Sequence, residues 1–263
     1  MLYVNQAYPT DLSDARWQII ERHLVRRQGP GRPMKVALRQ VINAILYLLR
    51  TGCQWRNLPP TFPRWYNVYY YFRKWAKDET WRMVQREVRK MERKRIQRQP
   101  QPTAGVIDSQ SVKTTEAGGV RGYDKHKNVN GRKRHIIVDT LGNLLEVVVH
   151  TASLQDRAGA REVFNKLDSE LLSSLKKVWA DGIYTGSLID WVKETFGLIL
   201  EVVKRDEGQV GFVVQPKRWV VERTFAWLGR YRRLSKDYEH CTKSSEAMIY
   251  LASIDIMLKR QPK

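Results

Sequence analysis

Three acidic residues are the candidates for chemistry in this sequence: Asp108, Asp181 and Glu222. Carboxylates that converge without basic partners repel one another and are costly to bury, and divalent cations relieve both effects. Two Mg²⁺ ions about 4 Å apart, with Mn²⁺ as a substitute, would activate the oxygen that attacks a phosphodiester and stabilise the oxygen that leaves. Magnesium favours carboxylate, water and phosphate oxygens, so one or two protein ligands per ion suffice. The chemistry to be tested is therefore metal-dependent cleavage of a phosphodiester.

Two of these acids also have a simpler interpretation. Glu222 stands four residues after Arg218 on a predicted helix, where an exposed ion pair is common and contributes only a few tenths of a kcal/mol. Asp181 precedes a glycine, as turn residues often do. The same region holds further acids that are alternatives for a metal site, namely Asp124, Asp139, Glu146 and Asp156. The residues alone leave this choice open.

The elements that would position the three acids are strands and helices of a mixed α/β region over residues 105–263. Apolar patterning predicts strands at 105–112, 133–140, 144–151, 176–180 and 198–204, and helices at 157–173, 187–196, 217–234 and 242–260. This order predicts a mixed five-stranded sheet that binds its ligand at the carboxyl ends of the strands. Asp108 lies on the first strand and Asp181 ends the fourth. If these strands are neighbours, both carboxylates share one edge, and the arginine-rich helix can deliver Glu222.

Residues 1–97 show helical periodicity. Four helices are expected: one capped by Asp11 or Ser13, one over 36–50 that ends at Gly52, one from Arg64, and one over 79–97. Short helices joined by tight turns and poor in acids favour a helix-turn-helix-like DNA-binding domain, with the third helix preferred for the groove. A helical bundle with a merely solvated basic face is the alternative. The Pro-containing segment 98–104 is the predicted linker between the two domains.

The charge of the chain points to a polyanionic partner. The 263 residues carry a formal net charge of +20, and residues 22–77 contain no acid. Nucleic acid or an anionic membrane would fit such a charge. The longest apolar run, residues 41–49, is too short to span a bilayer, and the N-terminal residues do not resemble a secretory signal. Double-stranded DNA is therefore the favoured partner, and no membrane is expected.

The cysteines and histidines indicate no metal centre. Cys53 and Cys241 form neither a disulfide framework nor a zinc signature, so reduced, buried thiols in a cytoplasmic, nucleoid-associated protein are expected. The five histidines are His23, His126, His135, His150 and His240. They lack metal-ligand spacing and are interpreted as structural or surface residues.

Several long motifs resemble one family. VIDSQSVK, QDRAGA, ADGIYTG and VVERTFAWLGRYRRLSKDYE, together with DLSDARW and RWYNVYYYFRKW, are similar to motifs of the transposases of the insertion-sequence-five family of bacterial mobile elements. The resemblance covers nearly the whole chain. It implies an RNase H-like domain with a DDE triad, in which Asp108 and Asp181 are the aspartates and Glu222 is the glutamate. Two positions depart from the pattern: Ile183 replaces a small residue before Tyr184, and Gly229 stands where a sister family has lysine, with Arg230 next to it.

The resemblance implies a DNA transposase that binds the ends of an element, cleaves them with Mg²⁺ and joins them to target DNA, as a homodimer or larger assembly on DNA. No Gly-rich phosphate loop is present, and none is needed when one phosphodiester is exchanged for another. The alternatives are a catalytically inert DNA-binding protein and a metal-dependent nuclease without strand transfer. The residues predicted to contact DNA are Arg32, Arg39, Arg64, Asn67, Arg73, Lys74, Lys113, Lys125, Lys127, Arg132, Lys133, Arg134, Arg218, Arg223 and Arg230.

Overall fold

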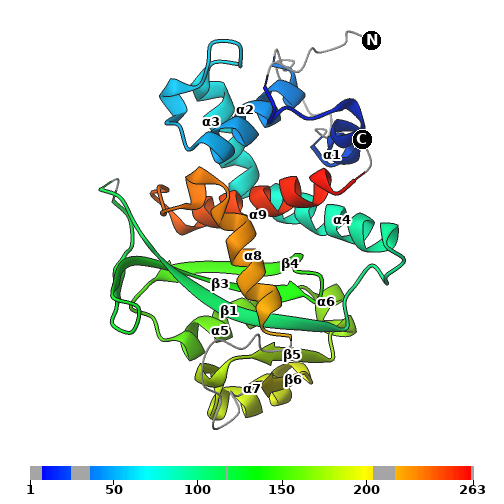
Figure 1. Ribbon diagram of the computed structural model, residues 1–263, viewed down its shortest axis with the longest axis vertical. Coiled ribbons are helices and arrows are strands. Elements are labelled where there is room, and N and C mark those ends of the chain that lie inside the picture. Colours follow the sequence, from blue (N-terminus) through cyan, green and yellow to red (C-terminus); the bar gives the residue numbers. More distant parts are fainter. Residues whose placement is uncertain (1–7, 25–35, 117, 204–216, 262–263) are drawn as a thin grey trace.

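A computed structural model describes residues 8–24, 36–116, 118–203 and 217–261. Helices α1 to α3 gather at one end of the molecule and the sheet lies toward the other, with α4, α8 and α9 between them (Figure 1). Arg32, which was predicted to contact DNA, lies outside the described residues. Among the helices of the described part, none is both long and apolar enough to cross a bilayer.

The predicted helices of the N-terminal region are confirmed. They are α1 (Asp14–Leu24), α2 (Leu38–Thr51), α3 (Trp65–Lys77) and α4 (Thr80–Arg95), with a short 3₁₀ turn at Trp55–Asn57. Ser13 Oγ accepts a hydrogen bond from the Arg16 amide at 3.4 Å, so Ser13 caps α1. Gly52 ends α2 in the left-handed region at φ +74°, as a glycine C-cap does.

The sheet contains β1 (Ala104–Lys113), β2 (Gly122–Asp124), β3 (Val129–Asp139), β4 (Leu144–Thr151), β5 (Lys177–Ala180) and β6 (Ile199–Val202). β1 is central and pairs antiparallel with β3 on one side and parallel with β5 on the other. β4 continues the sheet beyond β3, and β6 continues it beyond β5. The five predicted strands and the β3–β4 hairpin are confirmed, and their mixed order is RNase H-like. The three-residue strand β2 was not predicted.

Three predicted helices of this region differ from expectation in their bounds or in their capping residue. The single helix over 157–173 is two helices, α5 (Asp156–Asn165) and α6 (Ser169–Ser174), because Asp168 caps a new first turn by accepting from the Leu171 amide. The arginine-rich helix α8 (Trp219–Gly229) stops before a 3₁₀ turn at Arg232–Leu234. The last helix, α9 (Thr242–Lys259), is capped by Cys241 rather than by Thr242 or Ser244. α7 (Ser187–Phe196) agrees with its prediction.

Both faces of the sheet are covered, and each has its own core. Val106, Ile136, Val138 and Val147 pack with residues of α8, α9 and the N-terminal helices, whereas their strand neighbours on the other face pack with α5 and α7. The first core continues without interruption from the sheet into α1, α2, α3 and α4. The division into residues 1–97, 98–104 and 105–263 stays a prediction, and the two regions are joined by a common hydrophobic core.

Polar side chains of α4 attach this helix to the β3–β4 hairpin. Buried Arg89 donates through Nη1 to the carbonyls of Leu144 and Leu145, and Arg93 forms an ion pair of 2.6 Å with Asp139. Asp139 Oδ1 in turn accepts from two amides of the hairpin turn. Each buried carbonyl or carboxylate therefore has a donor, which satisfies the requirement for burying polar groups.

We expect Gly131→Ala to lower the free energy of unfolding by about 3 kcal/mol, because the added methyl group overpacks the sheet. At this position a Cβ would overlap the Val112 carbonyl oxygen and lie 2.9 Å from Lys113 Cα, and neither backbone atom can move without separating β1 from β3. Urea denaturation measures the change. Gly229→Ala is the matched control, because nothing lies within 4 Å of its Cβ. Its stability should stay within about 1 kcal/mol of wild type; equal losses in both variants would contradict the packing argument.

Candidate active site

Asp108 lies on β1, and Asp181 directly follows the adjacent parallel strand β5. The β1–β5 register pairs Ala104 with Lys177 and Val106 with Trp179. Continued by two residues, that register brings Asp181 opposite Asp108. The expectation that their strands are neighbours is confirmed.

Glu222 reaches the same edge from α8, and Arg218 connects it to Asp181. Arg218 Nη2 lies 3.7 Å from Asp181 Oδ2 and 3.8 Å from Glu222 Oε1, so two of the three acids share one guanidinium nitrogen. The simple i,i+4 ion pair is thus present, but its arginine also contacts an acid from the sheet. Half of the Glu222 side chain is exposed, and Asp181 Oδ1 accepts from the Ile183 amide at 3.0 Å.

The surroundings of Asp108 disfavour its charge. Burial, together with the nearby Asp181, raises the pKa of Asp108 to about 6, even though the Ser109 amide, Lys127 and Arg218 act in the opposite direction. The Ser109 amide donates to Asp108 Oδ1 at 2.7 Å. Within the described residues Asp108 forms no ion pair. A cation at this edge would therefore stabilise its charged form.

The alternative acids are already bound to cations of the fold. Asp139 pairs with Arg93, and Glu146 pairs with Arg82 at 2.7 Å. Asp124 and Asp156 both lie near Lys133 Nζ, at 3.4 and 3.2 Å. Because their charges are compensated inside the protein, these four acids have less need of a metal ion than Asp108.

A polar network that the sequence did not reveal supports β1 beside Asp108. Ser109 Oγ donates to Asp156 Oδ1 at 2.7 Å, and Lys127 Nζ donates to the Ser109 carbonyl at 3.0 Å. Behind Asp156, His135 Nδ1 and His150 Nε2 are 2.8 Å apart. On β3 the polar residues 132–135 directly precede the apolar residues 136–138, and this order gave no sign that both groups are buried. The histidines are structural, as expected.

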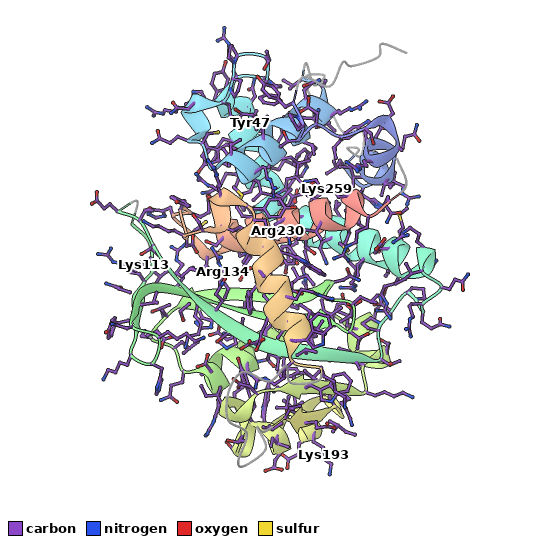
Figure 2. The ribbon with its side chains drawn as sticks, viewed as in Figure 1. Tyr47, Lys113, Arg134, Lys193, Arg230 and Lys259 are labelled. Atoms are coloured by element: carbon purple, nitrogen blue, oxygen red, sulfur yellow. The ribbon has the colours of Figure 1, made fainter. Side chains whose placement is uncertain are left out.

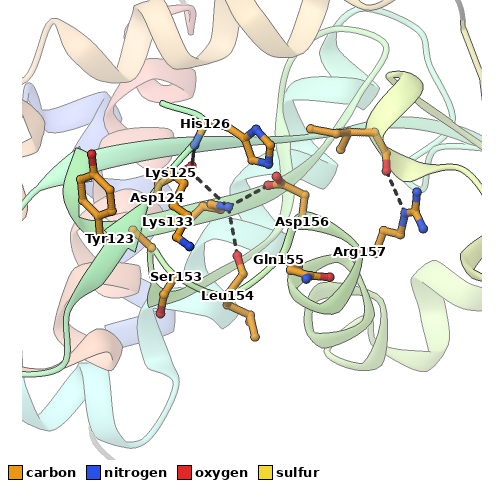
Figure 3. Close-up of a pocket in the computed structure, with 12 residues that line it drawn as sticks. Tyr123, Asp124, Lys125, His126, Lys133, Ser153, Leu154, Gln155, Asp156 and Arg157 are labelled. Atoms are coloured by element: carbon orange, nitrogen blue, oxygen red, sulfur yellow. Dashed lines mark hydrogen bonds and ion pairs between the residues drawn. The ribbon is translucent and has the colours of Figure 1, made fainter. Parts of the chain in front are cut away.

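A pocket of about 550 Å³ opens beside this network, between the β2–β3 hairpin and the start of α5 (Figure 3). Lys133 extends toward its wall, where Nζ contacts Asp124, Asp156 and the Leu154 carbonyl (Figure 3). Ile183, two residues after Asp181, also lines it. The pocket therefore adjoins the acidic edge.

The residues predicted to contact DNA divide by exposure. The exposed ones are Arg64, Arg73, Lys113, Lys125, Lys127 and Arg230, and the half-buried ones are Arg39, Asn67, Lys74, Arg218 and Arg223. Arg39 pairs with Asp14 at 2.5 Å and donates to the Leu12 carbonyl. Arg223 is stacked between Trp219 and Trp227. These two half-buried arginines therefore have internal partners.

The structure contradicts the prediction that Arg132, Lys133 and Arg134 contact DNA. Each exposes 2% or less of its surface, because β3 is covered on both faces. Arg132 donates to the carbonyls of Val120, Glu239 and His240 and pairs with Asp237, and Arg134 donates to carbonyls of residues 234 and 236. Buried, engaged cations do not reach a DNA backbone, so this run stabilises the fold instead.

The acidic edge fits a divalent ion by its chemistry. Asp108, Asp181 and Glu222 provide carboxylate oxygens only, the ligand type that Mg²⁺ prefers. Among the described residues, however, no group of three or more His, Cys, Asp or Glu side chains is arranged closely enough to hold an ion. Arg218 places its positive charge between two of the three acids. The three carboxylates are therefore suitable ligands for Mg²⁺, and in the protein alone Arg218 lies close to two of them.

Cys53 and Cys241 are both free thiols and both half-buried. The expectation of reduced cysteines agrees with this arrangement, whereas the expectation that they are buried does not.

Comparison with known families gives two matches. A model described as the transposase DDE domain matches residues 99–254, and a model of a transposase of the IS4/5 family matches residues 12–85. The first match alone covers more than half of the chain and includes all three acids of the edge. Neither the curated proteins nor the solved structures contain a significant match.

We expect the pair His135–His150 to make stability pH-dependent between about pH 6.5 and 4. Burial lowers the pKa of His135 from 6.5 to about 4, so the unfolded chain binds the additional proton in this window and stability falls as the pH falls. The contribution is up to about 3 kcal/mol. Asp108, whose pKa is raised, acts in the opposite sense. The measurement is therefore the difference in unfolding free energy between wild type and His135→Asn at each pH.

That difference should shrink from pH 6.5 to pH 4. His240→Asn, at an exposed position, is the control and should show a constant difference. A constant difference for His135→Asn as well would mean that His135 is not held neutral by burial.

Arg132→Met should lower the free energy of unfolding by about 3–5 kcal/mol, because Asp237 would lose its buried cation and several carbonyls would lose their donor. The exposed Arg230→Met is the matched control and should change stability by less than about 0.5 kcal/mol. Urea denaturation of both variants checks this. A small effect at Arg132 would indicate that its side chain can leave the interior.

Proposed function

The chain belongs to the IS4/5-family DDE transposases, and from this premise we propose that it binds the ends of a mobile element, cleaves them in an Mg²⁺-dependent reaction and transfers the cut strand into target DNA. Asp108, Asp181 and Glu222 are the proposed catalytic residues and metal ligands. The observation that carries the proposal is the parallel β1–β5 register, which sets Asp108 beside Asp181, with Arg218 linking Asp181 to Glu222.

The chemistry consists of two exchanges at phosphorus. In the first, a water oxygen bonds to the phosphorus at the element's end, and the bond to the 3′-oxygen breaks and leaves a 3′-hydroxyl. In the second, that 3′-hydroxyl attacks a target phosphate and displaces another 3′-oxygen. Two Mg²⁺ ions, when bound, supply activation of the attacking oxygen and stabilisation of the leaving oxygen.

The residues of the chain bind and orient the reacting groups. Asp108 and Asp181, fixed on adjacent strands, hold their carboxylates at one level, so the ligand geometry depends on backbone pairing rather than on a flexible loop. Glu222 is more exposed and completes the ligand set from a helix. Arg218 partly compensates the charges of Asp181 and Glu222 in the protein alone, and it would be free to bind a phosphate of the DNA if bound metal ions compensated those charges instead. Lys127, held at Ser109, provides a second cation beside Asp108.

The proposed partner is double-stranded DNA, with the terminal repeats of the element as specific ligand and target DNA as acceptor. Exposed cations on α3 and on the β2–β3 hairpin support this proposal. Because two ends have to be brought together, we also propose a homodimer or larger assembly on DNA.

The test uses the purified protein, labelled DNA that carries the ends flanking its gene, a supercoiled target plasmid, and Mg²⁺. We expect nicked ends and joined products, and we expect Asp108→Asn to reduce cleavage on the order of 10³-fold while DNA binding persists. Asp190→Asn, an exposed acid on α7, is the matched control and should cleave at the wild-type rate.

Three results would contradict the proposal in different ways. Binding without metal-dependent cleavage by wild type would identify an inert DNA-binding protein. Cleavage without joined products would identify a nuclease. Cleavage that survives in Asp108→Asn would show that other acids hold the metal.

A further inference from the structure

A cationic hollow lies between the second half of α3 and the first turn of α9. Its volume is about 360 Å³, and its cationic lining residues are Arg73, Lys74, Lys77 and Lys243. Among the described residues that line it there is no acid. Three of the cations come from the N-terminal helices and one, Lys243, comes from the region that carries the acidic edge. We call this hollow the α3–α9 cleft.

The four cations of the cleft form no ion pair with any described residue. The nearby acids are engaged elsewhere: Asp78 Oδ1 accepts from the Thr80 amide and hydroxyl, and Glu79 pairs with Arg82 at 3.1 Å. Glu246, one turn into α9, accepts from Lys166 at 2.8 Å and from the Val149 amide. The fold thus gathers like charges in one recess without compensating them, and an external anion would relieve their repulsion.

The approach to the cleft is also suited to DNA. Tyr66, Tyr70, Arg73 and Lys77 follow the i, i+4, i+7, i+11 spacing of a single helix face, and all four are exposed. The first turn of α9 faces the cleft through Lys243 and Ser244, and the side chain of its N-cap Cys241 bonds to the Ser244 hydroxyl rather than to a backbone amide of that turn. Amide groups at the start of an 18-residue helix therefore add to the positive potential that the cations create.

The shape of the cleft selects among the groups that DNA presents. A recess between two helices receives a group that protrudes from its partner. Phosphates protrude from a duplex, whereas base edges lie within the grooves, where a projecting side chain has to reach them. Lysine is a point charge with no fixed fork, which suits phosphate contacts without sequence preference.

We propose that the α3–α9 cleft binds phosphates of the DNA backbone without regard to sequence, and that Lys243 completes a site that α3 begins. This inference rests on DNA being the partner, as in the proposed function. Arg73 and Lys74, expected from sequence to serve a groove-reading helix, are assigned here to the backbone. Since Lys243 belongs to α9, the bound phosphate is fixed relative to both the N-terminal helices and the acidic edge.

The experiment measures binding of a 30-base-pair duplex by fluorescence anisotropy in EDTA, from 50 to 300 mM KCl, with an element-end sequence and with a scrambled one. For Lys77→Ala and Lys243→Ala we expect the slope of log K against log salt to become shallower by about 0.9 for each lysine removed, equally on both sequences. Affinity at 100 mM KCl should fall about 3- to 10-fold per lysine. Lys243→Arg should retain the wild-type slope.

Lys193→Ala is the matched control. This exposed lysine on α7 lies at the end of the molecule farthest from the N-terminal helices (Figure 2), so neither slope nor affinity should change. A wild-type slope in both cleft variants would overturn the inference, and so would a loss confined to the element-end sequence. Lysine-dependent binding to phosphatidylserine vesicles without such binding to duplex would also overturn it.

Metal is absent from these assays, so their outcome is independent of cleavage. If wild type binds no duplex at all, the proposed function fails together with the inference. If wild type binds and cleaves DNA but the cleft variants behave like wild type, the inference alone fails.

Discussion

The parallel pairing of β1 with β5 is the constraint on which the acidic edge depends. It brings Asp108 on β1 level with Asp181, which directly follows β5, and both burial and the nearby Asp181 disfavour the charge of Asp108. A protein that needed only stability would replace such a pair with apolar residues or supply each acid with its own cation. Here the cation, Arg218, comes from a separate helix and is shared between two acids. Within the protein, Arg218 thus partly compensates the charges of two of the three acids.

Four other acids near this edge are paired with cations of the surrounding structure. Asp139 and Glu146 are paired with arginines of α4, and Asp124 and Asp156 are paired with Lys133. These pairs also connect separate elements, because α4 joins the β3–β4 hairpin and Lys133 joins β3 to the start of α5. The same ion pairs therefore compensate the acids and attach the helices to the sheet.

The sequence sufficed to predict five of the strands and the hairpin, because period-two patterning and strand ends are local signals. A common edge for the two aspartates was expected only on the condition that their strands are neighbours, and that adjacency is not a local signal. It did not predict that Arg132 and Arg134 are buried. A basic run before an apolar stretch looks like the polar approach to a strand, and most of the carbonyls and acids that engage these arginines come from the segment 234–240, which is distant in sequence. The end of α8 was missed for a similar reason. Helical propensity continues to Leu234, but Tyr231 bonds to Asp255 at 2.7 Å and Arg233 pairs with Glu239, and these tertiary contacts redirect the chain.

The basic residues behind the net charge of +20 accordingly fall into two groups, those with partners in the described part of the fold and those without. Cations of α4 and β3 have partners within the fold: Arg86 with Asp168, Lys90 with Glu170, Arg132 with Asp237. The cations of α3 lie in the stretch 22–77, which contains no acid, and the neighbouring elements direct their own acids elsewhere. A surface that only needed solubility would mix signs, as α4 does. The cations of α3 instead lie together, without ion pairs to any described residue, next to the start of α9, and their positive potential favours an anionic partner, while the shared hydrophobic core joins α3 to the sheet.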